Sequence, residues 1–164
     1  MQAIVFPDGR FELAGQVLRA ALGRGGVRAD KREGDGATPV GLLTLRRVLY
    51  RADRGQRPDC AVPAEPLAPD DGWCDDPAHP DYNRKIRLPH QARHEALWRA
   101  DALYDLIGVL GWNDAPPVPG RGSAIFLHVA RDDLAPTDGC VALPAPVLRR
   151  VLAAGLTAIE VRGC

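Results

Sequence analysis

Proline and glycine restrict the folds open to this chain more than any other feature, because 15 prolines and 17 glycines are spread over 164 residues. Proline breaks the interior of a helix and glycine weakens it, so a bundle of helices is a poor match to this sequence. Both residue types are common in the turns that join strands. The composition therefore predicts a mainly β fold with many turns.

Short apolar runs between turn residues predict the positions of the strands. Residues 3–6 and 10–14 flank Pro7-Asp8-Gly9, and the Asp-Gly pair suits the tight turn of a hairpin. Residues 17–22 fit a strand or a short helix, and the glycine-rich stop at residues 23–26 favours the strand. The remaining predicted strands are residues 42–50, 85–88, 104–110, 124–130 and 157–161.

Two segments have the composition of short helices. Residues 94–103 are rich in helix-forming residues, and residues 146–154 begin with proline and end before Gly155, as helices often do. Residues 51–83 are rich in proline and aspartate, so we expect a long surface loop there. A chain of 164 residues without a repeat or a linker is expected to form one domain, residues 1–164, around one core.

The balance of charge excludes several classes of partner. Lys plus Arg and Asp plus Glu each total 21, so the chain carries no net field that would attract nucleic acid or an anionic membrane. No apolar segment approaches the length that spans a membrane, and the first residues lack the basic and apolar parts of a signal peptide. We therefore expect a small partner and a cytoplasmic protein. The alternative is a periplasmic protein whose leader has been removed.

The four cysteines lie at positions 60, 74, 140 and 164, without a CxxC pair or a spacing typical of a zinc site. We expect free thiols in a reducing compartment, with a disulfide between Cys60 and Cys74 as the alternative in an exported protein. Residues 71–83 contain four carboxylates and a histidine, but they lack the repeating ligand pattern of a calcium loop. The sequence thus predicts neither a metal nor a cofactor.

A histidine and a cysteine late in the chain have the arrangement of a thiol nucleophile and its base. His128 falls late in the apolar run 124–130, and Cys140 follows twelve positions later in a predicted turn. A neighbouring imidazolium lowers the pKa of a thiol and so activates it. Gly139 is expected to let a substrate reach backbone N–H groups that hold an oxyanion. Asp138 is expected to orient the turn or to act on the pair electrostatically.

The spacing of His128 and Cys140 alone is more typical of packing residues than of catalytic residues. The residues around the pair strengthen the catalytic interpretation. They resemble the catalytic domain of the L,D-transpeptidases, the YkuD-like family, whose pattern is a histidine on a strand followed by Ser/Thr-x-Gly-Cys-Val/Ile. Here His128 is followed by Thr-Asp-Gly-Cys-Val at residues 137–141. Upstream, Thr-Pro-Val-Gly at residues 38–41 resembles the family's turn before a strand. The resemblance runs from about residue 15 to the end of the chain.

The resemblance implies a fold, a reaction and a substrate. The fold would be a β-sandwich or open barrel with a helix after Cys140, and the substrates would be peptide stems of peptidoglycan or muropeptides. Cys140 would attack the carbonyl before the terminal D-alanine, while His128, oriented by a backbone carbonyl near Val129, would transfer the protons. Water would then give L,D-carboxypeptidase activity, and the amine of a second stem would give a 3,3 cross-link. The lack of a leader in the sequence leads us to expect the carboxypeptidase of murein recycling, with the cross-linking L,D-transpeptidase as the alternative.

Two other functions fit the residues less well. A non-catalytic module that binds muropeptides would not need both Cys140 and His128. A cysteine protease for ordinary L-peptides would resemble papain-type sequences, and the order of the motifs here is unlike theirs. The sequence leaves the oligomeric state open.

The chain departs from the family pattern at two points. The interval between His128 and Cys140 is shorter than usual, and Ala142 stands where the family commonly has an arginine. We expect Arg131 to bind the substrate carboxylate in its place, because a guanidinium forms a paired contact with a carboxylate. Further candidates for substrate binding are Arg84, Arg121, Thr137, and the aromatic residues Trp73 and Tyr82, which either form a wall of the cleft or anchor the loop to the core.

Overall fold

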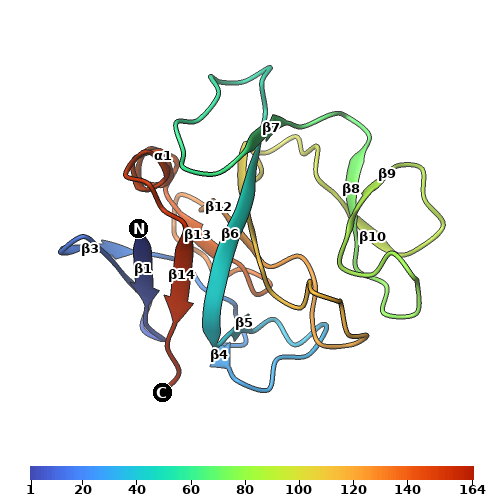
Figure 1. Cartoon of the computed structure of the whole chain (residues 1–164), viewed down its shortest axis with the longest axis horizontal. Coiled ribbons are helices and arrows are strands. Elements are labelled where there is room, and N and C mark those ends of the chain that lie inside the picture. Colours follow the sequence, from blue (N-terminus) through green and yellow to red (C-terminus); the bar gives the residue numbers. More distant parts are fainter.

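The computed structural model describes residues 1–164, with fourteen short strands and one helix as its regular elements (Figure 1). Nine strands belong to one nearly closed, barrel-like sheet, which confirms the predicted mainly β fold. These strands are β1 (Gln2–Val5), β2 (Arg10–Leu13), β3 (Gln16–Arg19), β6 (Gly41–Tyr50), β7 (Ala64–Pro66), β11 (Leu106–Leu110), β12 (Phe126–Val129), β13 (Val141–Leu143) and β14 (Ala158–Val161). Eight of them follow the order β13-β12-β11-β6-β14-β1-β2-β3, and β7 pairs with β6.

The N-terminal strands form the hairpins that the turn residues predict. β1 and β2 pair antiparallel, and Gly9 in the turn between them has a φ of 86°, which glycine adopts without strain. β2 pairs with β3, so residues 17–22 do contain a strand, although it ends at Arg19. β14 lies parallel to β1, which brings the last strand of the chain beside the first (Figure 1). The other strands predicted for this sheet are confirmed as β6, β11, β12 and β14.

Two backbone hydrogen bonds join the ends of this sheet. Ala21 N–H donates to Ala142 O and Ala142 N–H donates to Ala21 O, both at 2.9 Å. Ala21 follows β3 and Ala142 lies in β13, so these bonds link the first and last strands in the order of the sheet. Cys140 immediately precedes β13 and therefore lies at this junction.

The helix α1 (Ala145–Ala153) follows β13 and confirms the helix predicted at residues 146–154. Prolines begin it, where a missing N–H costs no hydrogen bond. Leu148, Val151 and Leu152 are buried on one side and belong to the same hydrophobic cluster as the interior of the large sheet. The helix thereby fixes the segment that leaves β13. At nine residues it is too short to cross a membrane.

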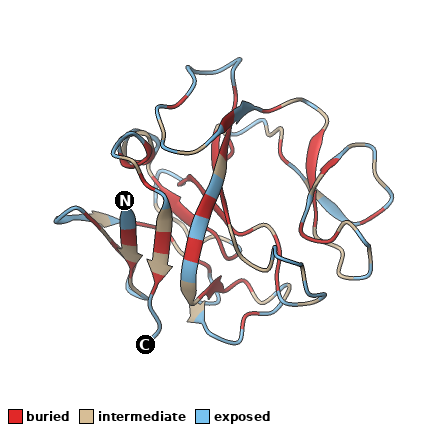
Figure 2. Cartoon of the chain, in the orientation of Figure 1, coloured by how far each residue is buried: buried red, intermediate tan, exposed pale blue.

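A second, three-stranded sheet corrects two predictions from the sequence. It contains β8 (Asp71–Cys74), β9 (Lys85–Arg87) and β10 (His94–Ala96), in the order β10-β8-β9. The helix predicted at residues 94–103 is wrong, because Glu95 pairs with Trp73 of β8 and the following residues form turns. The segment 51–83 is also more than a surface loop, since all four residues of β8 are buried (Figure 2). β9 confirms the strand predicted at residues 85–88.

The smallest sheet places a loop beside the Cys140 turn. β4 (Val27–Arg28) and β5 (Thr38–Pro39) pair in parallel. Between them, Asp35 accepts hydrogen bonds from the Lys31 ammonium group and from the N–H groups of Arg32 and Ala37. Thr38 Oγ1 accepts from Gly23 N–H at 2.9 Å. These bonds fix the loop between β4 and β5.

Candidate active site

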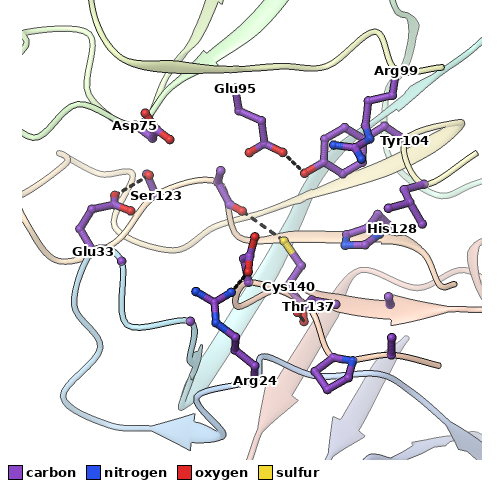
Figure 3. A pocket seen from close by; sticks show the side chains of 18 of the residues that line it. Arg24, Glu33, Asp75, Glu95, Arg99, Tyr104, Ser123, His128, Thr137 and Cys140 are labelled. Carbon is purple, nitrogen blue, oxygen red and sulfur yellow. Dashed lines mark hydrogen bonds and ion pairs between the residues drawn. The ribbon is translucent and has the colours of Figure 1, made fainter. Parts of the chain in front are cut away.

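β12 and β13 bring the predicted nucleophile and base to one face of the sheet. The two strands are parallel, with His128 beside Ala142. Cys140 precedes Ala142 by two residues, and every second side chain of an extended chain lies on the same side. Cys140 and His128 therefore share one face, and Figure 3 shows both side chains directed into the same pocket.

Hydrogen bonds within the Thr-Asp-Gly-Cys turn hold Cys140 in place. Thr137 Oγ1 donates to Cys140 O at 2.7 Å and accepts from Gly139 N–H at 3.1 Å. Gly139 has a φ of 131°, and a Cβ atom there would lie 2.8 Å from the carbonyl oxygen of Ala37. Because Gly139 N–H is already bound to Thr137 and Gly139 does not line the cavity, the glycine serves close backbone packing. Access of a substrate to the N–H groups around Cys140, the role expected from the sequence, stays a prediction.

Asp138 lies at the edge of the pocket, with 87% of its side chain exposed. Its carboxylate forms an ion pair with Arg24, which follows β3 (Figure 3). It makes no hydrogen bond within the turn, and its charge is not among the causes that shift the pKa of Cys140. Asp138 therefore links the turn to the other end of the sheet, and no motif in the sequence indicates the contribution of Arg24.

His128 is held as a neutral base. Its Nδ1 lies 2.8 Å from the carbonyl oxygen of Val129, which only accepts, so Nδ1 carries the proton and Nε2 is free to take another. The Val129 carbonyl is the one that the family resemblance implied. Burial lowers the pKa of His128 below its ordinary value, with a smaller opposing effect from the Val129 hydrogen bond.

The Cys140 thiol is neutral in this environment. Only 7% of Cys140 is exposed, and its sulfur lies 3.3 Å from Ala124 O and accepts the Phe126 N–H at 3.4 Å. Burial raises the pKa of the thiol to about 12, the negative charge of Glu95 adds to this, and the Phe126 N–H opposes it. The lowered pKa expected from the sequence is therefore wrong for the free protein. A neutral thiol and a neutral imidazole require the proton to move as the sulfur attacks.

The cavity in front of Cys140 has a volume of about 610 Å³. Charged groups of both signs line it. Its carboxylates are Glu33, Asp75, Glu95 and Asp138, and its cations include Arg24, Lys31 and Arg99, of which Arg99 lies on the His128 side (Figure 3). Arg131 also lines this cavity, and no carboxylate in the protein pairs with it, whereas the guanidinium of Arg99 binds Asp101.

The other two arginines predicted to bind substrate lie elsewhere. Arg84 lines a separate cavity on the far side of Trp73, and Arg121 lines neither cavity. Of the three candidates, the structure brings only Arg131 together with Cys140 and His128.

Trp73 and Tyr82 anchor their loop to the core and do not line the cavity with Cys140. The Trp73 ring packs edge-on against Phe126 at 5.1 Å, and its Nε1–H donates to Asn83. Tyr82 is 2% exposed, and its hydroxyl donates to Glu33 at 2.7 Å. Of the two roles that the sequence allowed for these residues, the structure supports the anchor.

Glu95 and Tyr104 are site residues that sequence reasoning missed. The Tyr104 hydroxyl donates to Glu95, and the Tyr104 ring packs edge-on against His128 with the ring centres 5.4 Å apart. Burial raises the pKa of Glu95 and also that of Tyr104. Their positions in sequence carry no motif, because two different segments bring them to Cys140 only when the chain is folded.

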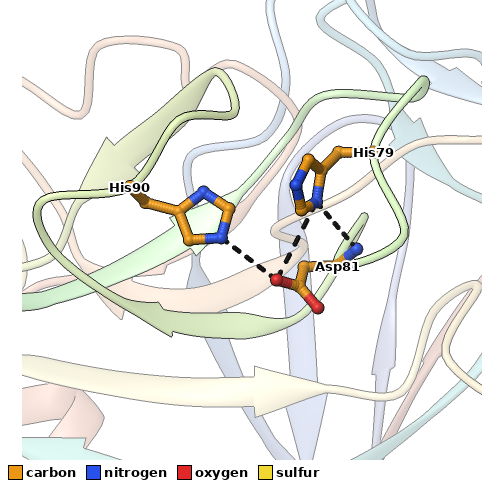
Figure 4. A group of neighbouring side chains, drawn as sticks. All are labelled: His79, Asp81 and His90. Carbon is orange, nitrogen blue, oxygen red and sulfur yellow. Dashed lines mark hydrogen bonds and ion pairs between the residues drawn. The ribbon is translucent and has the colours of Figure 1, made fainter.

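One group of side chains has the composition of a metal site. His79, Asp81 and His90 belong to the segment of chain that joins β8 to β10, and their ligand atoms lie within 4.8 Å of one another (Figure 4). The Nδ1 atoms of His79 and His90 accept from the backbone N–H groups of Asp81 and Ala92, each at 3.0 Å. A neutral imidazole that accepts a hydrogen bond at Nδ1 carries its proton on Nε2. A histidine that binds a metal instead offers one unprotonated ring nitrogen to the metal and donates a hydrogen bond from the other ring nitrogen. The group is arranged for hydrogen bonding, and His90 Nε2 lies 3.0 Å from Asp81 Oδ2.

The fold and the site together are those of a cysteine-based acyltransferase, with a thiol and an imidazole on neighbouring strands of a nearly closed sheet. The model of the L,D-transpeptidase catalytic domain, YkuD, matches residues 2–154, and the chain belongs to this family. The family uses a cysteine and acts on the peptide stems of peptidoglycan. The match includes the N-terminal hairpin, which precedes the part of the chain that the sequence resemblance covered. Comparison with curated proteins found no match, and neither did comparison with solved structures.

Proposed function

We propose that the protein is an L,D-carboxypeptidase that removes the terminal D-alanine from tetrapeptide stems of peptidoglycan. The observation that carries this proposal is the shared face of Cys140 and His128 at one cavity, in a chain that belongs to the YkuD family. Cys140 is the nucleophile and His128 is the base. No other cysteine lines the cavity.

In the first half of the reaction, the sulfur of Cys140 attacks the carbonyl of the L,D peptide bond. His128 Nε2 takes the thiol proton as the bond forms, since the thiol is neutral beforehand. The Val129 carbonyl accepts from Nδ1–H and stabilises the imidazolium that results. The imidazolium then gives its proton to the departing amine, D-alanine leaves, and a thioester remains on Cys140.

Arg131 binds the carboxylate of the terminal D-alanine. It lines the cavity, it has no ion pair within the protein, and Ala142 beside His128 offers no charge of its own. A guanidinium without an internal partner keeps all of its donors for a substrate carboxylate. Arg131 therefore replaces the arginine that the family commonly has at the position of Ala142.

Water is the acceptor that best fits the cavity. A volume of about 610 Å³ is within the range that holds one small ligand, and Cys140, which lines it, is 7% exposed. One stem bound there leaves room for water more readily than for the side chain of a second stem. The alternative is transfer to the amine of a second stem, which forms a 3,3 cross-link and is favoured by the transpeptidases in the family.

Mass spectrometry of the products tests this proposal. The protein is incubated with a purified disaccharide-tetrapeptide at millimolar concentration, with Cys140→Ala as the control. The proposal predicts disaccharide-tripeptide and free D-alanine from the unmodified protein and neither product from the variant. A dominant 3,3-linked dimer would show that the amine of a second stem, and not water, is the acceptor. The absence of free D-alanine would exclude both reactions and favour a module that only binds muropeptides.

A further inference from the structure

The three-stranded sheet carries Glu95 to the cavity opposite the catalytic strands. Glu95 of β10 pairs with Trp73 of β8, and the Trp73 ring packs against Phe126 at 5.1 Å. Phe126 N–H in turn contacts the Cys140 sulfur. This chain of contacts fixes β10 above the face of the large sheet that holds Cys140, and Figure 3 shows the Glu95 carboxylate directed into the pocket, where it meets the Tyr104 hydroxyl.

Tyr104 holds one oxygen of Glu95 and leaves the other available. The Tyr104 hydroxyl donates to Glu95 Oε1, while Oε2 has no hydrogen-bond partner in the protein. Tyr104 is 7% exposed and its ring is wedged against Phe126 and His128, so the hydroxyl has a defined position. A carboxylate with one fixed and one free oxygen can accept a proton from a molecule bound in the cavity.

No salt bridge accounts for the position of Glu95 in the cavity. Arg99, the nearest cation in the same cavity, binds the carboxylate of Asp101 instead. Glu95 is partly buried, and burying a carboxylate without a cationic partner costs free energy, so such groups concentrate at functional sites. Glu95 and Cys140 line the same cavity, so the two groups can act on one bound molecule.

We propose that Glu95 is a catalytic base for the second half of the reaction, in which water resolves the thioester, and that Tyr104 is its positioning residue. This inference rests on the proposed function. Glu95 Oε2 takes a proton from water while the water oxygen bonds to the thioester carbonyl carbon. The carbon–sulfur bond then breaks, the sulfur leaves as a thiolate, and Glu95 returns the proton to it. The product acid releases its own proton to solvent, and the free thiol and carboxylate are regenerated.

Rapid-quench kinetics with the tetrapeptide stem separates the two halves of the reaction. Glu95→Gln is expected to release about one D-alanine per protein at an initial rate no lower than that of the unmodified protein and then to slow by about 100-fold or more, the usual contribution of a general base. A thioester adduct should accumulate on the variant, as seen in its intact mass. Hydroxylamine, which attacks thioesters without a protein base, should remove the adduct. Glu65→Gln, an exposed site on β7, is the control and should behave as the unmodified protein. Tyr104→Phe should accumulate less adduct than Glu95→Gln.

Two results would overturn the role of Glu95. One is steady turnover by Glu95→Gln at the unmodified rate without an adduct. The other is the loss of the initial D-alanine release in this variant alone, which would move Glu95 to the first half of the reaction. A failure of the proposed function is distinguishable from both, because then the unmodified protein and Glu65→Gln would also show neither release nor adduct.

Discussion

Replacing Gly139 with alanine tests how the Cys140 turn is held. The new Cβ would lie 2.8 Å from the Ala37 carbonyl oxygen, and the residue would keep a φ of 131° that alanine rarely adopts. The backbone conformation costs about 1–3 kcal/mol and the overpacking a further ~1–3 kcal/mol. We therefore expect the free energy of unfolding to fall by about 2–6 kcal/mol in total. Hydrolysis should fall as well, because relief of the clash moves the backbone next to Cys140.

Urea unfolding measures this loss against a matched control. Gly41 has a φ of 137°, close to that of Gly139, and no atom within 4 Å of an added Cβ, so Gly41→Ala has the backbone cost without the clash. The difference between the two variants isolates the contact with Ala37, and we expect it to be about 1–3 kcal/mol. Equal losses in the two variants would refute the close approach of the two backbone segments.

The remaining predictions concern substrate binding, the turn and the thiol. Arg131→Ala should lower kcat/KM for the tetrapeptide about 10- to 100-fold, as expected for a hydrogen bond between charged groups, while Arg121→Ala should not, and equal effects would reject the assignment. Thr137→Val should destabilise the protein by about 1–3 kcal/mol in urea, because it removes both hydrogen bonds of the hydroxyl, whereas Thr137→Ser should keep them. Glu95→Gln should lower the pKa of Cys140, since a negative charge that disfavours the thiolate is removed. Iodoacetamide should then label Cys140 faster than in the unmodified protein at the same alkaline pH, and an unchanged rate would contradict this coupling.

Local signals in the sequence were sufficient to predict most strands of the large sheet. The Asp-Gly turn predicted the first hairpin, and the proline start with the Gly155 stop predicted α1, because both features act over a few residues. The helix predicted at residues 94–103 was wrong because contacts between distant segments decide the structure there. The helix-forming residues at 94–103 are overridden by pairing between β10 and β8, which lie about twenty residues apart in the chain. β8 itself has four residues and includes Gly72, so it was too short to show a strand pattern.

The residues of the site also divide into those that a local motif predicts and those that it does not. The motif predicted Cys140 and His128 because a turn and two neighbouring strands bring them together, and the register of β12 and β13 places them on one face. Glu95 and Tyr104 reach the site through pairing and packing between distant segments, which no local pattern records. The pKa of Cys140 is raised where the sequence led us to expect a lowered one, since burial of the thiol depends on the whole fold and is the largest cause of the shift.

The intact mass of the protein after rapid mixing with a tetrapeptide stem tests whether Cys140 is the nucleophile. We expect a transient adduct equal to the stem without its terminal D-alanine, located by peptide mapping on the fragment that contains Cys140. Cys140→Ala should show neither the adduct nor turnover, with a loss of activity on the order of a thousandfold or more. Turnover of the stem without an adduct on Cys140, or undiminished activity of Cys140→Ala, would contradict Cys140 as the nucleophile.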